Sequence, residues 1–138
     1  MHIKNLTLQN FKCFENLSID FHPNLTVIVG VNGSGKTSIM EGAAIALSTL
    51  FVKMDSLSGK KIDENQAHLK TFSMGSTKDV QKQYPVTVDA SAIIGGKDVS
   101  WARSLNKSNG NTTVINARSI IDCGVRFQQQ LRDGDTSL

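Results

Sequence analysis

The chain has 138 residues, 39% hydrophobic and 20% charged, a balance that fits one folded domain and excludes a disordered acidic or basic segment. The 15 Lys and Arg against 12 Asp and Glu give a net charge of +3, which is too small to identify a nucleic-acid-binding protein by charge alone. Two cysteines, Cys13 and Cys123, exclude a disulfide framework and a paired-cysteine metal site, and they favour a reducing compartment. The sequence shows no secretory leader and no apolar run of the ~20 residues that span a bilayer, so we expect a cytoplasmic protein without membrane contact.

Strand-like patterns occupy the first part of the chain. Residues 5–11 and 17–21 alternate apolar and polar side chains, which is typical of strands with one buried face. Residues 25–29 are apolar on both faces, which predicts a strand in the middle of a sheet that is covered on both sides. A glycine-rich turn over 30–35 then leads into 36–51, where abundant Ala, Ile, Leu and Met predict a buried helix.

The middle of the chain, residues 53–83, loses this regularity. Lys, Ser, Gly, Asp and Asn dominate, so the pattern predicts a polar loop or insertion with one short helix around 64–72. The lysines of this stretch are Lys53, Lys60, Lys61, Lys70, Lys78 and Lys82. Such lysines usually cover a solvated loop, and a DNA or RNA contact is the alternative. Whether this stretch docks a partner stays open.

Regular patterns return after this stretch. Residues 84–105 predict an antiparallel β-hairpin, because two alternating segments flank Gly95–Gly96 and both glycines accept the positive φ of a tight turn. Residues 112–133 predict a helix that ends at Asp133–Gly134. Trp101, within the hairpin, is expected to pack in the core rather than to stack on a base.

The segment 30–37, GVNGSGKT, fits the phosphate-binding pattern G-x-x-x-x-G-K-[ST] at every fixed position. It follows an apolar strand-like run and precedes a helix-like one, so backbone N–H groups and the helix N-terminus can converge on a phosphate. Lys36 can reach the β- and γ-phosphates of ATP, and the Thr37 hydroxyl can bind Mg²⁺. The predicted nucleotide-binding residues of this loop are Asn32, Gly33, Ser34, Gly35, Lys36, Thr37 and Ser38.

The flanking sequence resembles a family of ATPases. Residues 3–14, with their N-F-[KR]-x-F element, and residues 24–39 resemble the N-terminal lobe of ABC-type ATPases of the SMC, RecF and OLD kind. The segments 83–86, 99–106 and 131–135 resemble bacterial ATPases labelled as predicted ATP-binding proteins involved in virulence. That group includes PtuA-like ATPases of the Septu and retron anti-phage systems.

This resemblance implies an α/β fold, a P-loop NTPase lobe of the ABC type with an antiparallel β-hairpin subdomain. It implies that Lys12, which matches the basic residue after the aromatic one, lies near the nucleotide; an ordinary loop lysine is the equal alternative. It also implies a homodimer or higher oligomer that sandwiches ATP between two heads. An HNH nuclease partner of the PtuB kind, a retron reverse transcriptase with its RNA-linked DNA, and nucleic acid are further partners that it implies.

Two elements of an ATPase head are not found. A hydrolysing site needs a carboxylate pair at the end of a second apolar strand, yet Asp122 falls on the predicted helix and Asp89 on the polar face of the hairpin. Leu57–Ser58–Gly59 resembles the start of the LSGG signature but stands too early and is expected to be a turn. We therefore expect residues 1–138 to be the N-terminal part of one head, incomplete, which binds ATP without turning it over alone.

Within that head we expect strands, P-loop and helix over 1–52, the polar stretch over 53–83, the hairpin over 84–105 and the second helix over 112–133. The function that the resemblance implies is an ATP-binding subunit of an anti-phage complex that controls an effector nuclease. In the complete protein this subunit would hydrolyse ATP. Two alternatives stay open: a DNA-repair or chromosome-maintenance ATPase of the RecF or SMC kind, and a nucleotide-regulated assembly module without turnover.

Overall fold

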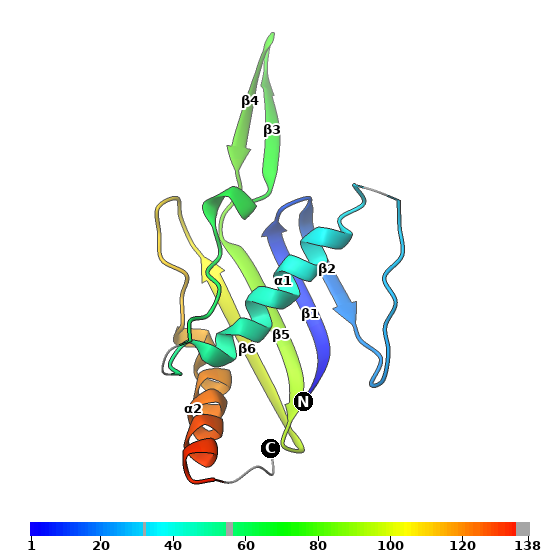
Figure 1. The fold of residues 1–138 in the computed structure, drawn as a ribbon. Helices are drawn as coiled ribbons and strands as arrows, with labels where there is room; N and C mark the ends of the chain where they lie inside the picture. Colours follow the sequence, from blue (N-terminus) through cyan, green and yellow to red (C-terminus); the bar gives the residue numbers. More distant parts are fainter. Residues whose placement is uncertain (32, 55–56, 135–138) are drawn as a thin grey trace.

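A four-stranded antiparallel sheet forms the centre of the molecule (Figure 1). The computed structural model describes residues 1–31, 33–54 and 57–134. The sheet contains β1 (His2–Phe11), β2 (Phe14–Asp20), β5 (Val86–Ile94) and β6 (Lys97–Leu105), in the order β2-β1-β5-β6. Each neighbouring pair runs antiparallel, so the sheet combines two hairpins through the β1–β5 contact.

One face of this sheet carries the hydrophobic core. Leu6 and Leu8 of β1 lie opposite Ala90 and Val88 of β5, and all four side chains are fully buried. Trp101 of β6 is also on this face and only 2% exposed, which confirms that it packs in the core. The residues that alternate with these along β1 and β5 are mostly polar, as expected for an antiparallel sheet with one buried and one solvent-exposed face.

Helix α1 (Lys36–Ser48) crosses the buried face of the sheet and continues into a 3₁₀ turn, η1 (Thr49–Phe51) (Figure 1). The Trp101 indole Nε1 donates a 3.0 Å hydrogen bond to the Ala46 carbonyl and so fixes the helix to β6. The helix predicted over 36–51 is therefore present, but it is buried on one face only, because Met40 remains 62% exposed.

Helix α2 (Arg118–Arg132) follows a 3₁₀ turn, η3 (Ile115–Ala117), and packs against η1 and β6. It is shorter than the helix predicted over 112–133, since residues 112–114 contain no regular element. Its buried stripe includes Ile120 and Gly124, which lie one helical turn apart.

The strand predicted over 25–29 is wrong. These residues form no strand, and Leu25, Val27 and Val29 are at least 70% exposed. A strand that is apolar on both faces needs neighbours on its edges and cover on its faces. The described strands pair with one another, and none of them pairs with this segment.

The polar stretch contains more regular structure than its composition predicts. Instead of a helix around 64–72, the chain forms a short 3₁₀ turn, η2 (Glu64–Gln66), and then a separate hairpin of β3 (Leu69–Met74) and β4 (Thr77–Lys82). The hairpin predicted over 84–105 is present as β5 and β6, and Gly95 and Gly96 both adopt positive φ in its turn. None of the described helices is long and apolar enough to cross a membrane.

Candidate nucleotide-binding site

The phosphate-binding pattern forms a compact turn directly before α1. The Ser34 amide donates a 3.1 Å hydrogen bond to the Val31 carbonyl, and the Lys36 ammonium donates a short one to the Gly30 carbonyl. The Lys36 side chain therefore folds back over the loop that precedes its own helix. Asn32, predicted to bind phosphate, lies outside the described residues.

Gly35 explains why this loop needs glycine at the start of the helix. Its φ of +101° lies in the left-handed region, which side chains rarely adopt. A Cβ atom at this position would lie 2.5 Å from Cζ of Phe14 and 2.8 Å from Sγ of Cys13. The turn between β1 and β2 thus packs directly on the P-loop, and only a residue without a side chain fits between them.

A surface pocket of about 380 Å³ opens at this junction. It is lined by Cys13, Gly33, Gly35, Lys36, Thr37 and Ser38. The first turn of α1 contains no acidic residue and no side-chain cap, so its backbone N–H groups are available to an anion. Together with the Lys36 ammonium, these groups fit a phosphate chain.

The exposed Thr37 hydroxyl is the oxygen ligand that the loop offers to Mg²⁺. Among the described residues, no group of three His, Cys, Asp or Glu side chains could hold a metal ion on its own. The pocket therefore fits a magnesium ion that arrives with its phosphates, and it does not fit a metal bound by protein carboxylates alone.

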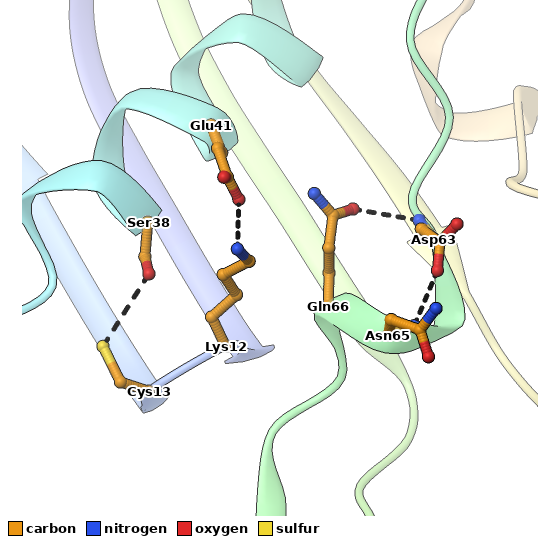
Figure 2. A network of polar contacts seen from close by, with 7 residues as sticks. All are labelled: Lys12, Cys13, Ser38, Glu41, Asp63, Asn65 and Gln66. Atoms are coloured by element: carbon orange, nitrogen blue, oxygen red, sulfur yellow. Dashed lines mark hydrogen bonds and ion pairs between the residues drawn. The ribbon is translucent and has the colours of Figure 1, made fainter.

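Two polar contacts connect the β1–β2 turn to α1 (Figure 2). The Cys13 thiol lies 4.0 Å from the Ser38 hydroxyl, and the Lys12 ammonium lies 2.8 Å from Oε2 of Glu41. Both side chains of the Lys12–Glu41 pair are about one third exposed. Lys12 is thus beside the P-loop helix, as its predicted role requires, but its charge is paired with Glu41 and it does not line the pocket.

The backbone of Lys12 is held from the other side by the segment that leads into β3. Its amide donates to the Gln66 carbonyl at 2.6 Å, and its carbonyl lies 2.8 Å from Nδ1 of His68. Asp63 begins this segment with a capping box, in which its side chain accepts from the Asn65 amide and its own amide donates to the Gln66 side chain (Figure 2). These contacts fix the position of Lys12 next to α1.

The sequence gives one overlooked signal for this arrangement. Glu41 is the only acidic residue within α1, in an otherwise apolar stretch of the helix. An acid in such a position needs a cationic partner, and that partner is Lys12. The spacing between the two residues, 29 positions along the chain, does not reveal the pairing.

Comparison with known proteins gives the family. Residues 5–133 match AAA_23, an AAA domain. The chain belongs to the AAA_23 family. The P-loop pocket, the turn that covers it and both helices lie within the matched range.

DNA repair proteins are among the relatives of this AAA domain. It is 49% identical over 41 residues to the DNA replication and repair protein RecF of Lactococcus lactis subsp. cremoris, covering 30% of this chain and 11% of RecF. It is 43% identical over 47 residues to the DNA double-strand break repair Rad50 ATPase of Halobacterium salinarum, covering 34% of this chain and 5% of Rad50. The chain thus spans only a small part of the length of these relatives.

A solved structure has the same fold. An SMC ATPase, from work on ATP-driven dimerization and DNA-stimulated activation, aligns with a TM-score of 0.60 at 21% identity over 88% of this chain and 76% of that chain. The predicted α/β fold of an ABC-type P-loop ATPase lobe is confirmed. The closer resemblance to PtuA-like ATPases stays a prediction.

Asp122 and Asp89, the two acidic residues considered for catalysis, do not line the pocket of this AAA domain, and neither does Glu64. Asp122 lies on α2, as the helical pattern predicts. Asp89 lies on the polar side of β5, where partial burial raises the pKa of its carboxyl. Glu64 lies in η2, and hydrogen bonds from Ser108 and from the Asn109 amide, with the charge of Lys82, lower its pKa. None of these carboxylates lines the P-loop pocket.

Proposed function

We propose that this pocket binds ATP with Mg²⁺ and that the complete protein is a DNA-repair or chromosome-maintenance ATPase of the RecF or SMC kind. The observation that carries the proposal is the pocket itself, in which Lys36, the α1 N-terminus and the Thr37 hydroxyl face one opening without a carboxylate. The family and the RecF and Rad50 relatives support the kind of ATPase.

Different groups of the loop bind different parts of the triphosphate and its metal ion. Backbone N–H groups of 33–38 bind phosphate oxygens, while Lys36 exchanges its contact with the Gly30 carbonyl for the β- and γ-phosphates. The Thr37 and Ser38 hydroxyls lie at the start of α1, where Thr37 binds the metal. A bound Mg²⁺ supplies charge neutralisation to the phosphates.

The described residues do not supply the carboxylate that hydrolysis requires, so we expect other parts of the complete head to provide it. The exposed apolar segment 25–31 supports this, because Leu25, Val27, Val29 and Val31 need cover from further strands. We therefore place 1–138 at the front of one ATPase head. Two heads that sandwich ATP are the assembly we propose, supported by the ATP-driven dimerization of the SMC neighbour.

The anti-phage role is the second candidate. It rests on the resemblance of segments 83–86, 99–106 and 131–135 to PtuA-like ATPases. In that case an HNH nuclease, with or without a retron reverse transcriptase and its RNA-linked DNA, would be the partner. The RecF and Rad50 relatives favour the DNA-repair reading over this one.

ATP turnover by the full-length protein, measured with and without duplex DNA, tests the proposal. We expect hydrolysis that increases when duplex DNA is added, and we expect Asp122→Asn to leave it unchanged because Asp122 lies on α2, away from the pocket. An ATP hydrolysis rate that is unchanged by DNA but changed by a co-purified HNH nuclease would favour the anti-phage role. Absence of ATP binding would refute both.

A further inference from the structure

The β3–β4 hairpin, in green, projects away from the rest of the molecule in Figure 1. All twelve residues of its two strands are exposed. At its base the Gln83 amide donates to the His68 carbonyl at 2.8 Å, and the His68 amide donates to the Asn10 carbonyl of β1 at 2.8 Å, which connects the ribbon to the sheet. A lone two-stranded hairpin is marginally stable in water, so a ribbon that exposes both faces is expected to gain stability from a partner.

The strand register divides the side chains between two faces. Leu69, Thr71 and Ser73 of β3 pair with Lys82, Val80 and Lys78 of β4. Because paired residues in an antiparallel ribbon point to the same side, these six residues form one surface, here called the donor face. It offers two ammonium groups and two hydroxyls, and it contains no carboxylate.

The opposite face is electrically balanced. Lys70 approaches Glu15 of β2 at 4.0 Å and lies 5.9 Å from the centroid of the Phe72 ring. Asp79, the one acid within β3 and β4, is also on this side and accepts a 2.7 Å hydrogen bond from Gln81. The positive charge of the ribbon is thus concentrated on the donor face.

We propose that the donor face binds the phosphate backbone of duplex DNA. The charge is complementary, since ammonium and hydroxyl groups are the side chains that bind DNA phosphates most often. The shape also fits, because a two-stranded ribbon has the width that the major groove admits. Lys78 and Lys82 are four residues apart on β4, roughly 13 Å, so they can reach separate phosphates.

The two lysines differ in their surroundings. No ion pair among the described residues involves Lys78 or Lys82, but Lys82 is close enough to Glu64 to influence that carboxylate. We therefore expect Lys78, nearer the tip, to contribute more to DNA binding than Lys82. This inference rests on the proposed DNA-linked ATPase function, and it assigns the contact to one surface.

The test compares charge-removing variants of the full-length protein on a labelled DNA duplex across a range of salt concentrations. Each phosphate contact contributes about 0.9 to the slope of log K against log salt, so Lys78→Gln with Lys82→Gln should lower that slope by roughly 1.8. Lys70→Gln on the opposite face and Lys97→Gln at the far end of the sheet, combined, remove the same charge as this double variant, and we expect them to leave the slope nearly unchanged. Each of the four substitutions is also measured as a single variant.

Several outcomes would overturn the assignment. Equal losses in all four single variants would show a general charge effect, and an unchanged slope in the double variant would place DNA elsewhere. A donor-face variant that changes only the oligomeric state, measured by light scattering, would show that the ribbon binds protein. ATP binding, measured on the same samples, separates these results from failure of the proposed function, because the ribbon variants should bind ATP normally.

Discussion

Lys36→Ala is expected to weaken ATP binding by about 100-fold, because it removes the ammonium that lies at the P-loop pocket. In the structure this ammonium is bonded to the Gly30 carbonyl, and we expect it to move to the phosphates when ATP binds. Isothermal titration of the full-length protein with ATP and Mg²⁺ measures the loss. The overall fold should be unaffected, since Lys36 is not one of the residues that form the hydrophobic core.

Lys97→Ala is the matched control for this variant. Lys97 is an exposed lysine at the start of β6, so its loss changes the net charge equally without touching the pocket. We expect ATP affinity close to that of the parent protein. If Lys36→Ala binds ATP as tightly as Lys97→Ala does, the nucleotide is not held by this loop.

Gly124→Ala is expected to destabilise the fold by roughly 2 kcal/mol, as overpacking in a core does. Gly124 faces η1 so closely that a Cβ atom would overlap the Leu50 carbonyl oxygen. A backbone atom cannot turn away as a side chain can, so α2 and η1 would have to separate. The gain of about 1 kcal/mol from replacing a helical glycine is too small to offset this. Thermal unfolding should show a Tm lower by roughly 5–10 °C.

Gly42→Ala provides the comparison in the other helix. A Cβ atom there would approach the terminal methyl groups of Leu8, at 2.6 and 3.1 Å, and a side chain can shift by a few tenths of an ångström. We expect a smaller loss of stability than for Gly124→Ala. Equal stability of Gly124→Ala and the parent protein would contradict the close packing of α2 on η1.

The sheet could be predicted where local sequence and tertiary structure agree. β5 and β6 alternate buried and exposed side chains, and Gly95 and Gly96 adopt the positive φ values of +58° and +77° that their turn requires. In this hairpin the alternation of apolar and polar residues and the turn residues predict the same structure, so no long-range information is needed.

Two segments could not be predicted because their structure depends on what surrounds them. The apolar run 25–29 has the composition of a central strand but no described neighbour to pair with. The β3–β4 ribbon is the opposite case, because it forms strands without having the composition of strands. Its exposed faces lack the apolar alternation by which strands are recognised, and its register is maintained by cross-strand pairing alone.

For the candidate site, the sequence predicts the phosphate-binding loop but not the residues from other segments that pack against it. The spacing of Gly30, Gly35, Lys36 and Thr37 is local. The structure brings Gly33, Gly35, Lys36, Thr37 and Ser38 together at one pocket, whereas Ser34 does not line it. The approach of Cys13 and Phe14 to Gly35 is a contact between distant segments, as is the Lys12–Glu41 ion pair. No spacing rule in one sequence reveals such contacts.

The rate of Cys13 alkylation, with and without ATP and Mg²⁺, tests most directly whether nucleotide occupies the P-loop pocket. Cys13 is exposed and lines that pocket, whereas Cys123 is buried and serves as an internal reference in the same protein. We predict that ATP slows the reaction of Cys13 several-fold while AMP, which lacks the β- and γ-phosphates, has little effect. An alkylation rate that saturating ATP leaves unchanged, with binding confirmed by titration, would contradict the assigned site.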